Sequence, residues 1–146
     1  MSLTLQQASA IVDAALQAGK ERGFHPLCIV VLDAGGHALA LKRDEHASIN
    51  RPEIATAKAA GCLGMGFGGR ELARRAQLMP GFIASLNALF PKGLVPVPGG
   101  VLIRDAANSL LGAVGISGDT SDNDEICAIA GIEAAGLVAD TGAQLA

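Results

Sequence analysis

The sequence predicts a single α/β domain in which an antiparallel sheet lies against helices. Helix patterns occur at both ends and in the middle of the chain, and two pairs of short apolar runs predict two β-hairpins. The expected order is one helix, two strands, a group of helices, two strands and a last helix. A doubly wound sheet would need strand–helix–strand crossovers, which this order lacks. The length of 146 residues fits one domain, 1–146.

The first helix and the first hairpin have clear boundary signals. The segment 4–7 (TLQQ) fits a capping box, and apolar residues then recur every three or four positions to about residue 20. The run 27–32 is short, β-branched and continuously apolar, as expected of a strand covered on both faces. The turn segment 33–37 (DAGGH) then leads into a second apolar run, 38–41. We therefore expect one helix followed by a hairpin.

The middle of the chain predicts further helices. Asn50 is expected to cap a helix that has Pro52 in its first turn and continues through the alanine-rich segment 54–63. After a glycine cluster, shorter helices are expected over 70–77 and within 82–90. The proline-rich segment 91–98 is interpreted as a connecting loop.

The last third predicts a second hairpin and a last helix. Its strands are expected over 99–103 and 110–116, with a polar turn between them. Asp122 and Asp124 lie in the first turn of a helix that is expected to continue to about Gly136 or beyond, where the helix dipole favours carboxylates.

Composition excludes several classes of function. The net charge is −3 and the charges are interspersed, so the concentrated basic surface of a nucleic-acid-binding protein is absent. The apolar runs are far shorter than the roughly 20 residues of a membrane span, and no secretory signal is evident, so a cytoplasmic protein is expected. The three cysteines lie far apart in apolar surroundings and are expected to be reduced core thiols.

The glycine cluster imitates a nucleotide-binding motif. Gly64, Gly66 and Gly69 satisfy the pattern G-x-G-x-x-G. That motif requires a preceding strand and an acidic residue about 20 positions further on, which binds the ribose. Here an alanine-rich helix precedes the cluster, and no Asp or Glu occurs between Glu71 and Asp105. We therefore expect a flexible connector and no nucleotide cofactor.

The densest group of candidate reactive side chains consists of Arg43, His46, Glu53 and Lys58. Glu53 and Lys58 are five positions apart, which separates them by about 140° around a helix, so Lys58 needs a partner of its own. One interpretation makes Glu53 a capping carboxylate and Lys58 a solvated helix residue. The other places the four side chains in one cleft. The scattered histidines show no metal-ligand spacing, and any metal stays unknown.

Several segments together resemble the GlcG/HbpS family over roughly residues 3–138. They are 30–37 (VVLDAGGH), Arg43, 57–59 (AKA), 98–100 (PGG), 112–118 (GAVGISG), Asp124 and 130–131 (AG). The resemblance extends to the C-terminal domain of PduO-type proteins. It implies a profilin-like α/β sandwich, with an antiparallel sheet of about four to five strands flanked by helices, that assembles into homo-oligomers.

The resemblance also implies candidate ligands and site residues. Haem binding is the activity associated with HbpS-like proteins, so haem or a related tetrapyrrole is the foremost candidate ligand. The positions of the shared pattern that are candidates for binding a ligand or framing its pocket are Arg43, Lys58, Gly99, Gly100 and Asp124. Side chains capable of axial coordination are His25, His37, His46, Met65 and Met79, and spacing selects none of them.

Three hypotheses for function follow from the sequence. The first is an oligomeric protein that binds a small molecule such as haem. The second is a cofactor-independent catabolic enzyme, in which Arg43 or Lys58 holds a small carboxylate while Glu53 or His46 transfers a proton. The third is a structural assembly protein whose polar positions form salt bridges between subunits.

Overall fold

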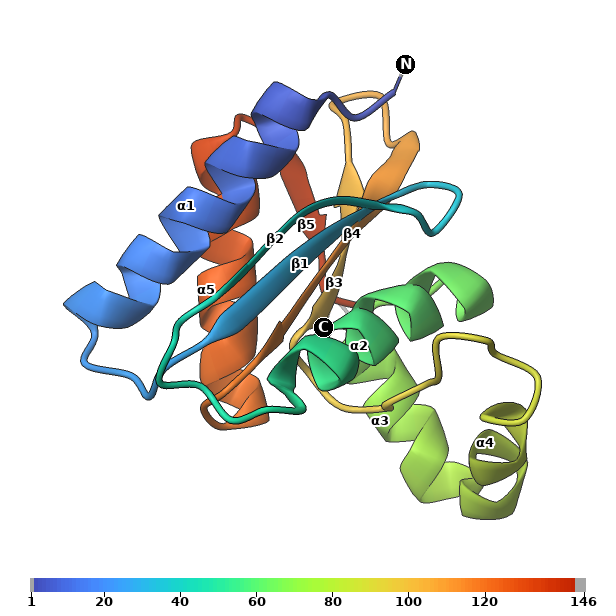
Figure 1. Ribbon diagram of the computed structural model, residues 1–146. Helices are drawn as coiled ribbons and strands as arrows, with labels where there is room; N and C mark the ends of the chain where they lie inside the picture. Colours follow the sequence, from blue (N-terminus) through green and yellow to red (C-terminus); the bar gives the residue numbers. More distant parts are fainter. Residues whose placement is uncertain (1, 144–146) are drawn as a thin grey trace.

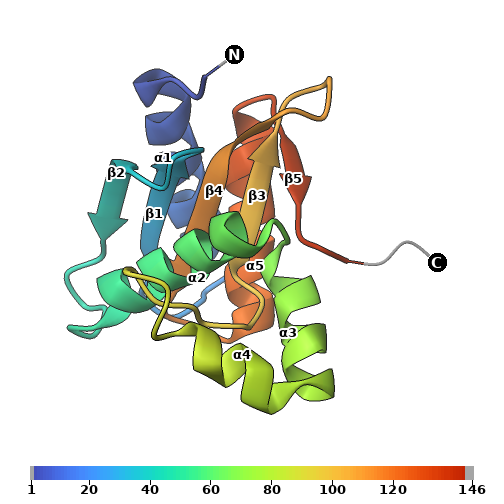
Figure 2. The same cartoon turned by 90° about the vertical axis from the view of Figure 1, so that its right-hand side faces the viewer.

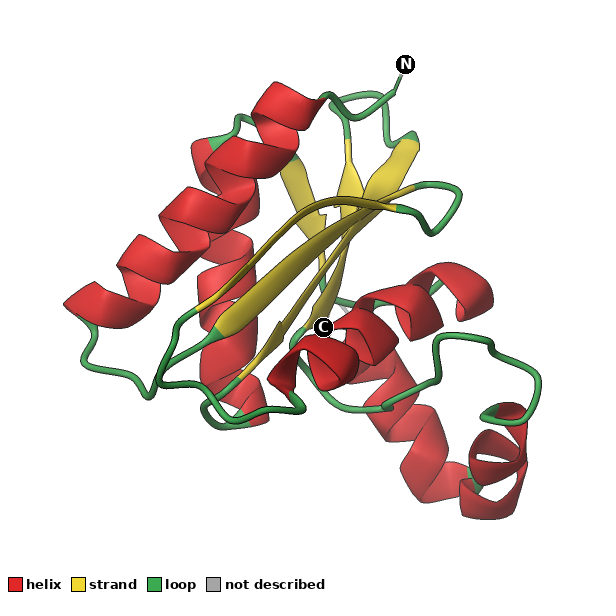
Figure 3. Cartoon of the chain, viewed as in Figure 1, coloured by secondary structure: helices red, strands yellow, loops and turns green. Residues whose placement is uncertain are grey.

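A five-stranded antiparallel sheet forms the centre of the structure, and helices cover both of its faces (Figures 1 and 3). The computed structural model describes residues 2–143. The strands are β1 (Cys28–Asp33), β2 (Ala38–Arg43), β3 (Gly100–Arg104), β4 (Leu110–Ser117) and β5 (Val138–Asp140). The helices are α1 (Leu5–Glu21), α2 (Arg51–Met65), α3 (Gly69–Leu78), α4 (Pro80–Leu86) and α5 (Ser121–Ala134). The predicted α/β sandwich is confirmed.

The sheet order is β2-β1-β4-β3-β5, so the two predicted hairpins lie side by side and are joined through β1 and β4. Because strand side chains alternate between faces, β1 contributes to two cores. Ile29 and Val31 pack with α1 and α5, whereas Val30 and Leu32 pack with α2 and its neighbours. Figure 2 shows α2, α3 and α4 together on one side of the sheet.

The helix N-termini agree only in part with the sequence signals. Thr4 and Gln7 form the expected capping box, with both hydrogen bonds at 3.0 Å. Asn50 precedes α2 but makes no side-chain capping bond, because its backbone (φ −97°, ψ 7°) lies outside the extended conformation of a typical cap. Asn50 therefore occupies the predicted N-cap position, and its carbonyl accepts the Ile54 N–H at 3.1 Å, but the expected side-chain capping bond is absent.

Two boundaries also differ from the expectation. The last helix ends at Ala134, and the chain then forms the three-residue edge strand β5, which the sequence analysis did not predict. The glycine cluster is a closely packed corner between α2 and α3. A Cβ atom at Gly68 would lie 2.1 Å from the carbonyl carbon of Thr141, so the absence of a side chain permits this contact. The glycine cluster connects two helices, as expected. The expectation that this connector is flexible is wrong.

The three cysteine thiols, Cys28, Cys62 and Cys127, are free and buried. Burial raises their pKa values to about 11, about 12 and about 11 respectively, which keeps them protonated at neutral pH. Among the described residues, no helix has both the length and the apolar character needed to cross a membrane.

Glu71 on α3 gives the protein a pH dependence. Its carboxylate accepts hydrogen bonds from Arg74 and Arg75 at 2.7–2.8 Å, and these bonds lower its pKa from 4.5 to about 2. Because the folded pKa lies below the unfolded one, the stabilisation is complete above pH 4.5 and is lost as the pH falls towards 2. We therefore expect Glu71→Gln to unfold at a lower urea concentration than the wild type at pH 6. Near pH 2.5 the urea midpoints of the two proteins should converge. An R74Q/R75Q variant should show the same convergence; a constant difference between pH 6 and 2.5 would contradict the assignment.

Candidate functional site

Lys58 and Asp124 form a buried ion pair that connects the two helical layers. The ammonium of Lys58 on α2 donates to the Ile116 carbonyl at 2.9 Å and to Asp124 Oδ2 at 3.1 Å. The two side chains are only 4% and 1% exposed. The expectation that Lys58 needs a separate partner is confirmed, and the interpretation of Lys58 as a solvated residue is wrong.

Desolvation dominates the electrostatics of this pair. Burial lowers the pKa of the Lys58 ammonium and raises the pKa of the Asp124 carboxyl, and each partner's opposite charge counteracts the shift. The second carboxylate oxygen of Asp124 accepts the backbone N–H of Asp119 at 3.0 Å. The ammonium nitrogen of Lys58 and both carboxylate oxygens of Asp124 therefore each have a hydrogen-bond partner within the protein.

Two glycines make room for the pair. Gly99 has φ +110°, and a Cβ atom there would lie 3.0 Å from the Lys58 ammonium. At Gly100 a Cβ atom would lie 2.6 Å from the Lys58 carbonyl oxygen. The structure thus brings together four of the five positions implied by the resemblance, and it does so in a packed junction of α2, α5 and the sheet.

The other candidate residues lie elsewhere. The guanidinium of Arg43 donates to the backbone carbonyls of Asp44, Glu45 and Ala47, at 3.0–3.3 Å, and so holds the loop after β2. Glu53 is exposed in the first turn of α2. Among the described residues, Arg43, His46, Glu53 and Lys58 share no hydrogen bond or ion pair with one another.

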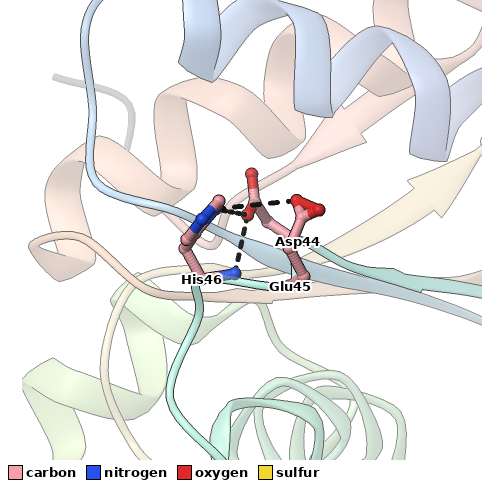
Figure 4. Close-up of side chains that lie close together, drawn as sticks. All are labelled: Asp44, Glu45 and His46. Atoms are coloured by element: carbon pink, nitrogen blue, oxygen red, sulfur yellow. Dashed lines mark hydrogen bonds and ion pairs between the residues drawn. The ribbon is translucent and has the colours of Figure 1, made fainter.

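His46 lies in a small polar cluster on the loop that Arg43 holds (Figure 4). Its Nδ1 atom is 3.2 Å from Asp44 Oδ1 and 3.6 Å from Glu45 Oε1, and one ligand atom from each of the three lies within 4.8 Å of the others. His46 and Glu45 are exposed. The side chain of Asp44 also accepts the backbone N–H of His46, so these contacts order the turn.

A pocket of about 370 Å³ lies beside α2, away from the Lys58 pair. Three segments form it: the turn between β1 and β2, the outer side of α2, and the loop that follows α4. Its lining residues are Ala34, Gly35, Gly36, Ala60, Leu63, Gly64, Phe90, Pro91, Lys92 and Gly93. Nearly all of these side chains are apolar or absent. The pocket can therefore accept an apolar molecule.

A second pocket of about 300 Å³ adjoins the first and shares Pro91 and Lys92 with it. Its other lining residues, Pro52, Glu53 and Thr56, lie in the N-terminal part of α2. We call the two pockets together the α2 groove. Lys92 lies where they meet, and its ammonium donates to the carbonyl of Gly36 across the groove.

The groove was not predicted from the sequence, because the proline-rich segment 91–98 indicates only a connecting loop. One signal was available: Lys92 is the only lysine after Lys58, and it stands among prolines and glycine. Of the groove residues, only Glu53 was among the candidates.

The structure separates the five possible axial ligands. His37 is exposed in the turn that lines the first pocket, and a Cβ atom at Gly35 would lie 3.3 Å from its ring. His25 lines a pocket of only about 90 Å³. Met65, the last residue of α2, is partly buried against the core on that side of the sheet, and Met79 is exposed at the corner between α3 and α4. His37 directly follows Gly36, which lines the apolar pocket of about 370 Å³, and this size falls within the range of small-molecule sites.

Comparison with known proteins identifies the family. A family model described as "Haem degrading protein HbpS-like" matches residues 3–133. The chain belongs to the HbpS-like family. The resemblance seen in the sequence is therefore confirmed. No curated protein matches the sequence.

Solved structures agree with this assignment. The chain is 27% identical to HbpS, with a TM-score of 0.78 over 91% of this chain and 89% of that one. A PduOC–haem complex has a TM-score of 0.84 at 22% identity, covering 96% and 99% of the two chains. Klebsiella pneumoniae protein ORFY, of the DUF336 family, has a TM-score of 0.81 at 24% identity over 92% and 90%. The last two identities support the fold alone.

Proposed function

We propose that this HbpS-like chain is an oligomeric small-molecule-binding protein, and that its ligand is haem or a related tetrapyrrole held in the apolar pocket of the α2 groove. The single observation that carries the proposal is this pocket: at about 370 Å³ it falls within the range of small-molecule sites, about 300–1,000 Å³. Family membership supports the ligand class, and one structural neighbour is described as a haem complex.

The residues present fit such a ligand. Leu63 and Phe90 provide apolar walls for a macrocycle. The exposed imidazole of His37, one residue after Gly36 of the pocket wall, is of the type that commonly binds haem iron. Bound haem would supply a redox-active iron. The contribution of the chain would be to exclude water from the bound ring through Leu63 and Phe90 and to offer the imidazole nitrogen of His37 to the iron.

Exposed apolar side chains support the oligomeric part of the proposal. Leu78, Met79 and Phe82 lie together in sequence at the corner between α3 and α4 and are 65%, 44% and 52% exposed. Clusters of this kind often mark protein contacts. The enzymatic alternative has no comparable support. The Lys58 ammonium is buried in its own ion pair, and the Arg43 guanidinium donates to backbone carbonyls of the loop after β2.

The test is a titration of the apo-protein with haemin, monitored in the Soret band, together with the solution mass from light scattering. We expect saturation at a fixed stoichiometry, and a His37→Ala variant with a shifted Soret maximum and an affinity lower by about tenfold, about 1.4 kcal/mol. His25→Ala is the matched control and should behave as the wild type. The absence of saturable binding would reject the haem proposal, and an unchanged His37→Ala spectrum would reject the axial assignment.

A further inference from the structure

We propose that the α2 groove selects flat apolar molecules that carry a carboxylate, and that Lys92 binds this carboxylate. The inference deepens the proposed function and rests on it for the location of the site. It assigns a class of ligand and a specificity-determining residue, and it applies to any such acid, whether or not it contains iron.

The charge of Lys92 is the first observation. Its ammonium carries three N–H donors, and the structure gives it one acceptor, the neutral carbonyl of Gly36. Among the described residues no carboxylate lies within 4 Å of it. Lys92 is exposed, so its charge lies at the edge of the apolar pocket with no carboxylate partner among the described residues. A ligand carboxylate would form a stronger, charge-assisted hydrogen bond than the carbonyl does.

The shape of the apolar pocket is the second observation. Gly35 and Gly36 on one wall and Gly93 on the other present backbone without side chains. The ring of Phe90, from the loop after α4, packs directly on Gly64 of α2. A Cβ atom at Gly64 would lie 2.7 Å from this ring. A glycine at this position lets the aromatic ring form a continuous wall with the helix. Such surfaces favour a flat apolar partner, since aromatic rings stack in offset or edge-to-face arrangements.

The adjoining pocket is the third observation. Glu53 and Thr56 lie in its wall, and successive groove positions on α2 follow the three- and four-residue spacing of one helix face. The second pocket thus adds two polar side chains, Glu53 and Thr56, to a groove that is otherwise mostly apolar, and Lys92 lines both pockets. A carboxylate attached to an apolar ring in the first pocket would reach Lys92 where the two pockets meet. Glu53 opposes additional negative charge there, so Glu53→Gln should strengthen binding of the acid.

The experiment compares metal-free protoporphyrin IX with its dimethyl ester, using porphyrin fluorescence and the full-length protein. The two probes differ in their carboxylates and share the same ring. We expect the wild type to bind the acid about tenfold more tightly than the ester. Lys92→Gln should lose this preference and bind the ester as before, and Lys92→Arg should keep the preference. Lys42→Gln is the control, because Lys42 is exposed on β2 and pairs with Asp13.

The outcomes separate this inference from the proposed function. Equal affinity of the wild type for the acid and the ester would overturn the role of Lys92. An equal loss of affinity for both porphyrins in Lys92→Gln would do the same. In either case, saturable binding of haemin would still support the haem proposal. Binding of protoporphyrin IX through Lys92 without saturable haemin binding would reject haem alone. If neither porphyrin binds, the inference is overturned.

Discussion

Lys58→Met is expected to lower the free energy of unfolding by about 3–5 kcal/mol, the cost typical of leaving one member of a buried ion pair without its partner. The substitution keeps most of the volume of the side chain and removes the ammonium that bonds to Asp124 and to the carbonyl of Ile116. Urea or thermal unfolding monitored by circular dichroism measures the loss. Asp124→Asn should lose a similar amount, because it leaves the Lys58 ammonium buried without an anion.

The double variant K58M/D124N is the matched control. It contains no unpaired buried charge, so it should be more stable than the sum of the two single losses implies. The deficit of Lys58→Met should also shrink towards acid pH. Burial raises the pKa of Asp124, so lowering the pH protonates the isolated carboxyl and removes the cost of its charge. If the double variant loses the sum of the two single losses in unfolding free energy, the contact between Lys58 and Asp124 contributes no coupling energy.

The elements that local signals define could be predicted from the sequence. The capping box of Thr4, the glycine turn of the first hairpin and the acidic start of α5 each depend on residues a few positions apart. The edge strand β5 could not be predicted, because three residues carry too little pattern and their strand conformation depends on pairing with β3. Asn50 shows the opposite error: the residue type suits a cap, but the backbone conformation set by the preceding loop does not.

Only one feature of the candidate site could be predicted, and it came from the spacing of residues within one helix. The spacing of Glu53 and Lys58 showed that Lys58 needs a separate partner, but Asp124 lies 66 positions away and on the other side of the sheet. The groove could not be predicted, because its walls come from a hairpin turn, a helix and a loop that meet only in the fold. The proposed role of Lys92 in binding a carboxylate depends on this arrangement of the three segments and not on the residues next to it in the sequence.

Gly115→Ala is expected to lower the free energy of unfolding by at least about 3 kcal/mol, the upper part of the usual range for overpacked cores. Gly115 lies on the central strand β4, paired with Val30 and Gly100. A Cβ atom there would lie 1.8 Å from the carbonyl oxygen of Ala55 on α2. Since the obstacle is backbone and not a flexible side chain, the helix as a whole must move. A lower thermal midpoint, by about 10 °C for a domain of this size, would report the loss.

The displacement should also reach the ligand site, because the same helix carries Ala60 and Leu63 of the groove. Gly115→Ala is therefore expected to weaken porphyrin binding even in the fraction of protein that stays folded. Gly81→Ala on α4 is the control: a Cβ atom there meets nothing within 4 Å, so alanine should leave binding unchanged and raise stability by up to about 1 kcal/mol through its helix propensity. If Gly115→Ala unfolds and binds as the wild type does, α2 does not lie against β4 at the distance that positions the groove.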